Sequence, residues 1–396
     1  MMAKTSAEQM RAWQGPALFS FGFRPFFFFG ALWAALAMLL WLTALSGALA
    51  LPTRFDPVSW HAHEFLFGYL GAVLAGFLLT AVPNWTGRLP MVGWRLAGLF
   101  ALWIAGRLAV LVSGHLPVAV APAIDLAFPL VLGGLILREI VAGRNWRNLI
   151  VLGLLAVFTL ANGIFHIEGL TGAYAAQGIG LRLGIATGLM MIAVIGGRII
   201  PSFTRNWLAK ENHPARPAPP MQRIDKLVLL ASIALLTLWV ARPFESTTGA
   251  ALLAFGALHL ARQARWQPHH TRREPLLWVL HAAYLFIPLG AFVLGLDQII
   301  GNPGTAGAQH LWTAGAIGGM TLAVMTRASL GHTGQPLTAN RATLAIYLCL
   351  FGSVLARFGA SIRPELLHVS GALWFAAFAG FVIAYGPALL CPKPEK

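Results

Sequence analysis

The sequence predicts an all-α membrane protein with about twelve transmembrane helices. Hydrophobic residues make up 58% of its 396 positions and charged residues only 10%. A soluble chain of this length would need roughly a quarter of its residues charged to cover its surface. Apolar runs of about 20 residues, the length that crosses a bilayer, recur along the whole chain. We therefore expect a single polytopic membrane domain over residues 1–396.

The apolar runs place the predicted helices in chain order, and most charged residues fall between them. They are expected near residues 25–49, 61–83, 94–112, 117–138, 148–167, 179–200, 224–241, 248–264, 275–297, 307–328, 340–357 and 366–390. The polar, proline-rich stretch at 205–223 is the longest connection and is expected to be a cytoplasmic linker.

Basic residues set the predicted orientation of these helices, because loops on the cytoplasmic side carry an excess of Lys and Arg. Only six of the 28 basic residues lie in segments that would face outward: Arg54, Arg107, Arg182, Arg242, Arg357 and Arg363. The asymmetry predicts that both termini, residues 1–24 and 391–396, are cytoplasmic. The net charge of +15 follows this alternation, so we expect the lipid bilayer, and no nucleic acid, as a partner.

A weak internal repeat suggests that the helices form three units of four. Arg24, Arg147 and Arg273 each precede the opening of a long apolar run, and they lie at regular intervals along the chain. The second helix of each unit ends in a related turn, so the helices at 61–83, 179–200 and 307–328 would be equivalent and inner. A pseudo-threefold arrangement is the fold that this pattern favours.

Histidines near the predicted outer ends of three helices are the main candidates for chemistry, since ionisable residues in a membrane are costly. They are His61 and His63 of the WHAHEF motif, His166 and His310. Two residues along a helix correspond to about 200° of rotation. If the motif is helical, the two imidazoles of its HxH face opposite sides and cannot share one metal. If it is extended, they can. Imidazole suits haem iron, copper and zinc alike.

Further candidates lie beside these histidines and towards the inner side. Glu64 follows the HxH and is a candidate proton relay; Asn162 precedes His166 by one turn and can orient it. Arg107 and Arg182 can pair either cofactor carboxylates or the acids Glu64 and Glu168. The inner group comprises His259, His281 and His332, and Tyr284 shares a helix face with His281. Each lone histidine has the alternative role of a hydrogen-bonded packing residue.

Long motifs spread over the chain resemble the NnrS family. They are FGFRPFF at 21–27, WHAHEF at 60–65, GGRIIPSFTRN at 196–206, REPLLWVLHAAY at 273–284 and MTLAVMTRASLGHTGQPL at 320–337. One departure is Phe65, where the family usually has Met. The resemblance implies a bacterial inner-membrane protein that holds one or two haem b groups, with copper as a second metal, and that takes part in nitric oxide metabolism and nitrosative stress.

The resemblance also implies site residues. Carried over by motif, His61, His63, His281 and His310 are the expected ligands of haem or metal, with His166 next and His259 as a further metal candidate. Glu64 and Tyr284 are expected to act in catalysis, and Arg107 and Arg182 to bind the cofactor. More distantly, three four-helix units resemble the catalytic subunit of haem–copper oxidases and nitric oxide reductases. There the HxH lies on another helix, so residue roles do not transfer.

Three functions compete at this point. The first is a haem or haem–copper protein that binds or reduces nitric oxide or a related nitrogen oxide, with electrons from a quinol or a c-type cytochrome. The second is a twelve-span secondary transporter, for which Asp125 is the main acidic candidate. The third is a metal- or haem-dependent assembly factor. The two cysteines form no CxxC, so an iron–sulfur site and covalently attached haem have no support.

Overall fold

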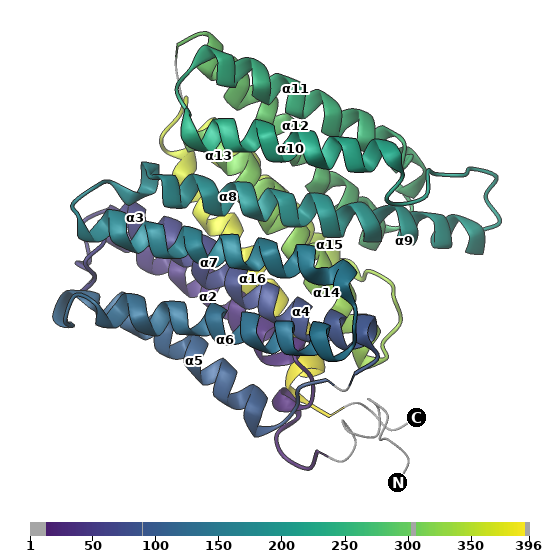
Figure 1. The fold of residues 1–396 in the computed structure, drawn as a ribbon, viewed down its shortest axis with the longest axis horizontal. Coiled ribbons are helices and arrows are strands. Elements are labelled where there is room, and N and C mark those ends of the chain that lie inside the picture. Colours follow the sequence, from purple (N-terminus) through teal and green to yellow (C-terminus); the bar gives the residue numbers. More distant parts are fainter. Residues whose placement is uncertain (1–12, 89, 302–305, 393–396) are drawn as a thin grey trace. The chain divides into compact units, whose positions relative to one another are not determined.

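A computed structural model describes residues 13–88, 90–301 and 306–392, and the chain is helical throughout these ranges, with no strand in them (Figure 1). All twelve predicted spans are helical. Ten helices in the described ranges are long and apolar enough to cross a membrane, which supports a multi-pass membrane protein. The two predicted spans outside these ten are 248–264 and 307–328. Residues 1–12 and 393–396 of the predicted cytoplasmic termini lie outside the described residues.

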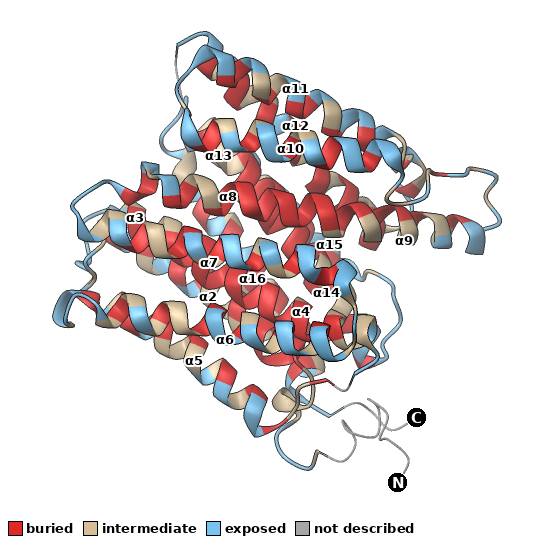
Figure 2. Cartoon of the chain, in the orientation of Figure 1, coloured by how far each residue is buried: buried red, intermediate tan, exposed pale blue. Residues whose placement is uncertain are grey.

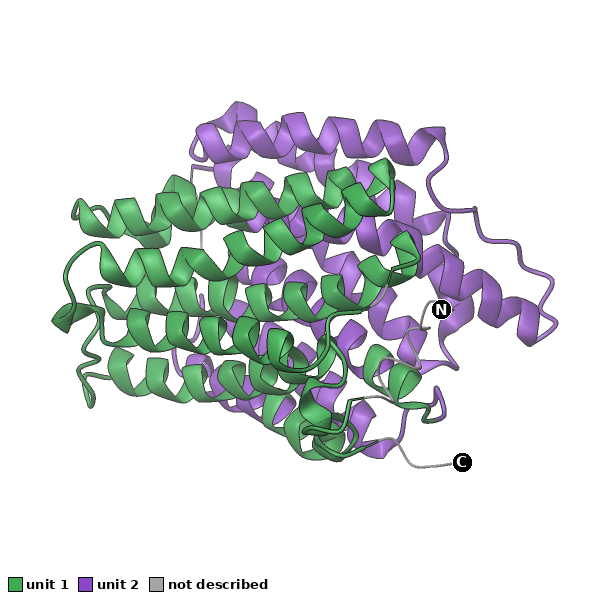
Figure 3. Cartoon of the chain, turned by 60° about the horizontal axis from the view of Figure 1, so that its bottom comes forward, with its two compact units in different colours: residues 1–184, 328–335, 378–396 green, residues 185–327, 336–377 purple. Residues whose placement is uncertain are grey.

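The chain divides into two compact units, shown in green and purple in Figure 3. The first comprises Met1–Gly184, Ala328–Gln335 and Phe378–Lys396. Its helices are α2 (Phe23–Leu45), α3 (Pro57–His63), η2 (Glu64–Tyr69), α4 (Leu70–Thr86), α5 (Trp94–Leu111), α6 (Val120–Ala142) and α7 (Leu149–Leu170). The boundary falls inside α8 (Ile179–Met191), so the units do not coincide with the three predicted groups of four helices.

The second unit comprises Ile185–Arg327 and Pro336–Ala377. It holds the end of α8, then η6 (Ile192–Gly196), α9 (Gly197–Lys210), α10 (Arg223–Ala241), α11 (Ser246–Ala264), α12 (Pro275–Ile299), α13 (Ala306–His310), η8 (Leu311–Gly318), most of α14 (Gly319–Thr333), α15 (Arg341–Gly359) and the start of α16 (Leu366–Leu390).

The predicted linker at 205–223 begins too early, because α9 continues to Lys210. Ile200, Thr204 and Leu208 recur every four residues and are buried, so the helix keeps packing through this stretch. The connection that follows is held in place at two points. The Arg205 guanidinium donates to the Pro217 carbonyl at 2.7 Å, and the Ala218 N–H donates to the carbonyl of Arg265 at 3.0 Å.

Three π-helical segments interrupt the spans that the repeat predicts to be equivalent. They are η2 at Glu64–Tyr69, η6 at Ile192–Gly196 and η8 at Leu311–Gly318. π-Helical turns are rare in proteins, and those that do occur frequently lie at functional sites. The spans Pro57–Thr86 and Ile179–Lys210 are also the most buried of the ten, at 83% and 78% of their apolar windows, as expected for inner helices (Figure 2).

Candidate functional site

The WHAHEF motif is helical because its start is capped. The Asp56 carboxylate accepts hydrogen bonds from two backbone N–H groups of the first turn of α3, at 2.9 and 3.0 Å, and Pro57 stands at the first helical position. Both features favour a helix at this point. The HxH therefore lies within α3, and of the two conformations that the sequence leaves open, the structure has the helical one.

The two histidines of the motif accordingly have different surroundings. His61 stacks on Trp41, with ring centroids 4.1 Å apart, and lies 4.5 Å from the ring of Phe65. His63 is fully buried, and its ring centroid is 4.8 Å from that of His166 on α7. His63, and not His61, therefore faces His166.

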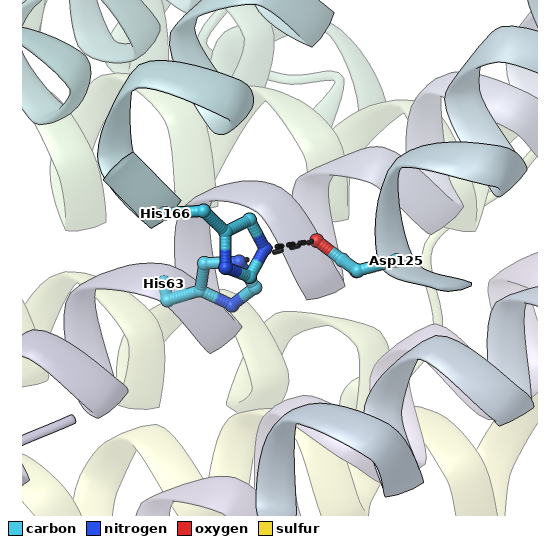
Figure 4. A group of neighbouring side chains, drawn as sticks. All are labelled: His63, Asp125 and His166. Carbon is cyan, nitrogen blue, oxygen red and sulfur yellow. Dashed lines mark hydrogen bonds and ion pairs between the residues drawn. The ribbon is translucent and has the colours of Figure 1, made fainter. Parts of the chain in front are cut away.

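His63, Asp125 and His166 form a buried cluster contributed by α3, α6 and α7 of the first unit (Figure 4). The Asp125 Oδ2 atom lies 3.0 Å from His166 Nε2 and 3.3 Å from His63 Nε2. One ligand atom from each residue lies within 4.8 Å of the others. The side chains are 5% exposed or less. Two imidazoles and a carboxylate at this spacing can hold one metal ion.

A second carboxylate, Glu64, is held beside the cluster by Arg107 of α5. The Arg107 Nη1 atom donates to both Glu64 oxygens at 2.9 Å, and Nη2 donates to Asp125 Oδ1. The indole of Trp33 donates to Glu64 Oε2 at 2.8 Å, and His63 Nδ1 lies 3.0 Å from Glu64 Oε1. Of the two pairings predicted for Arg107, the one with Glu64 is present in the structure.

Asn162 bridges two members of the cluster, Asp125 and His63, rather than the predicted His166. Its amide donates to Asp125 Oδ2 at 2.7 Å, and its oxygen lies 3.0 Å from His63 Nε2. Asn162 thus orients His63 and Asp125, whereas the sequence suggests His166. The helical spacing places Asn162 and His166 on one face of α7, and both side chains reach Asp125 independently.

Two glycines make room for these contacts. A Cβ at Gly68, within η2, would overlap the Arg107 guanidinium and lie 3.0 Å from Glu64 Oε2. A Cβ at Gly106 on α5 would lie 3.1 Å from Asp125 Oδ1. The π-helical segment η2 begins at Glu64 and contains Gly68. The ion pair between Arg107 and Glu64 therefore requires a residue without a side chain at position 68 of this segment.

The charges of the site do not cancel unless it takes up a cation. The carboxyl groups of Glu64 and Asp125 share a single guanidinium partner, that of Arg107. If both carboxyls are ionised and His63 and His166 are neutral, one negative charge is left in a buried place, which is costly. A proton on His63 or a metal ion bound by His63, Asp125 and His166 restores neutrality. The arrangement is therefore suited to holding a proton or a metal ion.

The second unit has a buried polar network of its own. Arg262 on α11 donates through Nε to Asp225 Oδ1 at 2.8 Å and through Nη1 to the Tyr284 hydroxyl at 3.1 Å. Tyr284 Oη lies 2.7 Å from His259 Nδ1, and His259 Nε2 lies 2.9 Å from Ser232 Oγ. Both nitrogens of His259 are engaged, so the structure places this metal candidate and the proposed catalytic Tyr284 in a hydrogen-bonded chain.

Two other predicted ligands of haem or metal, His281 and His310, belong to the second unit. His281 on α12 is buried, with Nε2 2.9 Å from Thr204 Oγ1. His310 ends α13, and its Nδ1 donates to the Ala306 carbonyl at 2.5 Å. Of the four histidines expected to gather near the outer face, the structure brings His63 and His166 together, and His310 belongs to the second unit.

Arg182 and Glu168 both hold the connection between α7 and α8. Arg182 donates to the Gln177 carbonyl, and Glu168 accepts from the backbone N–H groups of Ile179 and Gly180, at 2.6 and 3.2 Å. The Glu168 carboxylate therefore caps the start of α8, where a negative charge is favourable.

Sequence reasoning missed part of this chemistry. Arg262 counts only as an orientation signal near the end of a span, and Asp225, at the start of the predicted span 224–241, is not singled out, yet they form a fully buried ion pair. Asp125 attracts notice only as a candidate for transport. The available signal is the rule that any ionisable residue within an apolar run needs a partner there.

The family of this chain follows from comparison with known proteins. The model of the family described as NnrS protein matches residues 17–393. The chain belongs to the NnrS family. Membership fits a protein of the nitric oxide response, and the match covers both units of the NnrS protein described above. A search of curated proteins finds no match.

Proposed function

We propose that this NnrS protein is a metalloprotein of the bacterial inner membrane that binds nitric oxide, with both termini in the cytoplasm. Its metal ion, copper or iron, is held by His63, Asp125 and His166. The observation that carries the proposal is the convergence of three ligand atoms within 4.8 Å of one another on buried side chains. A buried ionisable cluster in a membrane span is a functional site by default.

The donor set fits such an ion. Imidazole suits copper and iron, and two imidazoles with one carboxylate leave further coordination positions open. A metal ion with an open position supplies the binding place for a diatomic ligand such as nitric oxide. Asn162 donates to Asp125 Oδ2 and so fixes the direction of that ligand, as residues behind metal ligands commonly do, whereas a metal on His63 Nε2 would replace the hydrogen bond between that nitrogen and Asn162 Oδ1.

Glu64 and Arg107 would set the proton balance around this ion. His63 Nδ1 lies 3.0 Å from Glu64 Oε1, so a proton on that nitrogen is shared with a carboxylate that Arg107 keeps in place. When a metal occupies His63 Nε2, the hydrogen bond from Nδ1 to Glu64 keeps the imidazole in the required tautomer. Reduction of nitric oxide needs protons, and Glu64 is the group placed to deliver them.

For haem b, which the family resemblance implies, we propose the histidines outside the cluster. His63 is assigned to the metal ion above, and His61 lies on the same helix, where its ring stacks on the indole of Trp41. His310 is the second haem candidate. Electrons for nitric oxide reduction would come from a quinol or a c-type cytochrome.

The test is metal and haem analysis of the purified protein from cells grown with copper and iron. We expect bound metal in the wild type and a loss of about tenfold or more in affinity in Asp125→Asn and His166→Gln. His115→Gln, in an exposed connection, is the control and should keep the metal. A Soret band should be present and disappear in His61→Ala or His310→Ala.

Two results would refute the proposal. Metal content that is equal in wild type, Asp125→Asn and His166→Gln would exclude the cluster as the binding site. A wild type that is free of metal and colourless, and that drives solute uptake in liposomes, would favour a transporter instead.

A further inference from the structure

The second unit has a cavity of about 600 Å³ where the end of α11 meets the start of α12 (Figure 1). Its walls come from the last turns of α11, the 3₁₀ segment η7 (Pro268–Thr271) and the first turns of α12. Because α12 is one of the ten helices that can cross a membrane, the connection before it lies at a membrane surface. The volume is within the range of about 300–1,000 Å³ that small-molecule sites occupy.

The end of the cavity at this connection is basic. His269 and Arg272 line it, and both residues are exposed. Residues 265–274 hold three arginines and a single acid, Glu274, which is typical of a cytoplasmic connection. Glu274 does not line the cavity, and its Oε1 accepts from the Leu276 N–H at 3.1 Å. Within the described part of the chain, Arg272 has no carboxylate partner, so its charge is available to an anion.

The other polar residues of the wall contribute little to recognition. Gln263 and His281 are only 3% and 4% exposed, and the Gln263 amide donates to the His281 carbonyl at 2.6 Å. Thr271 is fully buried, and its hydroxyl donates to a carbonyl within η7 at 2.7 Å. A polar group in the cavity therefore meets chiefly His269 and Arg272.

The opposite end of the cavity is apolar and reaches the lipid-facing surface. Leu260, Ala282 and Leu285 line it, about one to three helical turns away from the connection. Leu260 and Leu285 are 43% and 37% exposed on helices of a membrane protein. Trp278, in the first turn of α12, lies between the two ends, at the interfacial depth where tryptophan is enriched. The cavity is thus basic at the membrane surface and apolar towards the bilayer interior.

We propose that this cavity binds an anionic phospholipid of the cytoplasmic leaflet. Basic pockets between transmembrane helices on this side of a membrane suit anionic head groups. The lipid phosphate would pair with the Arg272 guanidinium and accept a hydrogen bond from His269. The acyl chains would pass Leu260 and Leu285 into the bilayer. A lipid covers both ends of the cavity, whereas a soluble phosphate would cover only the basic end.

The experiment uses native mass spectrometry of the purified full-length protein, with phosphatidylglycerol or phosphatidylcholine of the same acyl chains added. We expect phosphatidylglycerol to bind at least about fivefold more tightly, the factor that one basic side chain near an anionic lipid supplies. Arg272→Gln should remove most of this preference, and Arg272→Lys, which keeps the charge, should retain it. Lys226→Gln removes an exposed charge outside the cavity wall and should have no effect. Equal affinity for the two lipids, or an equal loss in Lys226→Gln, would refute the site.

A cavity-filling variant tests the apolar end. Ala282→Phe leaves the charges in place and should abolish retention of phosphatidylglycerol, while Leu289→Phe, at an exposed position of the same helix outside the wall, should not. Circular dichroism compares the helix content of both variants with that of the wild type. If Ala282→Phe does not fold, the Arg272 variants still decide the matter, because that residue is exposed.

A further arm separates a lipid from a soluble anion. Inorganic phosphate, added in excess, should leave the bound phosphatidylglycerol in place, because it makes no contact with the apolar end. Lipid that phosphate displaces, or that is still retained by a folded Ala282→Phe variant, would overturn the proposal. The metal site proposed for the first unit shares no residue with this cavity, so either proposal can fail alone.

Discussion

Removing the Arg107 guanidinium should be among the most damaging single changes in the first unit. The side chain is 4% exposed and pairs with Glu64, at 0%, and Asp125, at 2%. In Arg107→Met an apolar side chain of similar length replaces it, and two carboxylates remain buried without their partner. Breaking a buried pair in this way costs about 3–5 kcal/mol.

A surface pair of the same chemistry provides the comparison. Arg88 lies 2.7 Å from Glu139, but its side chain is 45% exposed. Exposed pairs contribute about 0.2–1 kcal/mol, so Arg88→Met should change the free energy of unfolding by no more than that. The difference between the two variants isolates the effect of burial.

The assay is unfolding of the purified protein in mixed micelles, followed by circular dichroism as denaturing detergent is raised. The triple variant Arg107→Met, Glu64→Gln and Asp125→Asn should recover much of the loss, because it removes the charges as well as their partner. If Arg107→Met lies within about 1 kcal/mol of the wild type, the carboxylates are not both ionised and buried, and the charge argument for the site fails.

Two further predictions concern packing and titration. Gly68→Ala should destabilise the protein by about 1–3 kcal/mol, since its Cβ overlaps Arg107. Gly98→Ala, whose Cβ meets open space on helix α5, should be neutral or stabilising by up to about 1 kcal/mol in the same unfolding assay, and equal effects would refute the steric role of Gly68. In the connection between α11 and α12, partial desolvation, together with the neighbouring imidazoles of His269 and His213, lowers the pKa of His270 from its usual 6.5. The folded state then holds fewer protons than the unfolded one just below pH 6.5, so the stabilising contribution is complete above that pH and declines as the pH falls. NMR titration should find the His270 pKa raised in His213→Ala, and an unchanged value would contradict the effect of that neighbour.

The sequence alone predicts the helices well, because a bilayer imposes a length and a composition that single apolar runs display. It also singles out His63 and Glu64, because ionisable groups in such runs stand out. It does not predict that Asp125 and Asn162 complete the site. Their meeting depends on how three helices pack, and no local pattern records that.

The same limit explains the residues that are misread. Arg262 follows the rule for cytoplasmic basic residues by position, and only the packing of α10 against α11 reveals Asp225 as its partner. The start of α3, in contrast, can be recognised from the local sequence. An Asp followed by Pro is a helix-start signal, and it decides that the HxH is helical.

The π-helical segment η2 changes how two parts of one span are oriented relative to each other: the site residue His63 before it and the packing face of α4 after it. A regular helix turns by about 100° per residue, so the direction of His63 would fix the direction of every side chain from Leu70 onward. The wider turn at Glu64–Tyr69 adds a residue to the winding, so the packing face of α4 is rotated relative to His63 compared with a regular helix. Deleting one residue within η2 would restore the regular winding and rotate one face against the other. Small deletions here should therefore be far less tolerated than substitutions, and the length of this segment is itself part of the site.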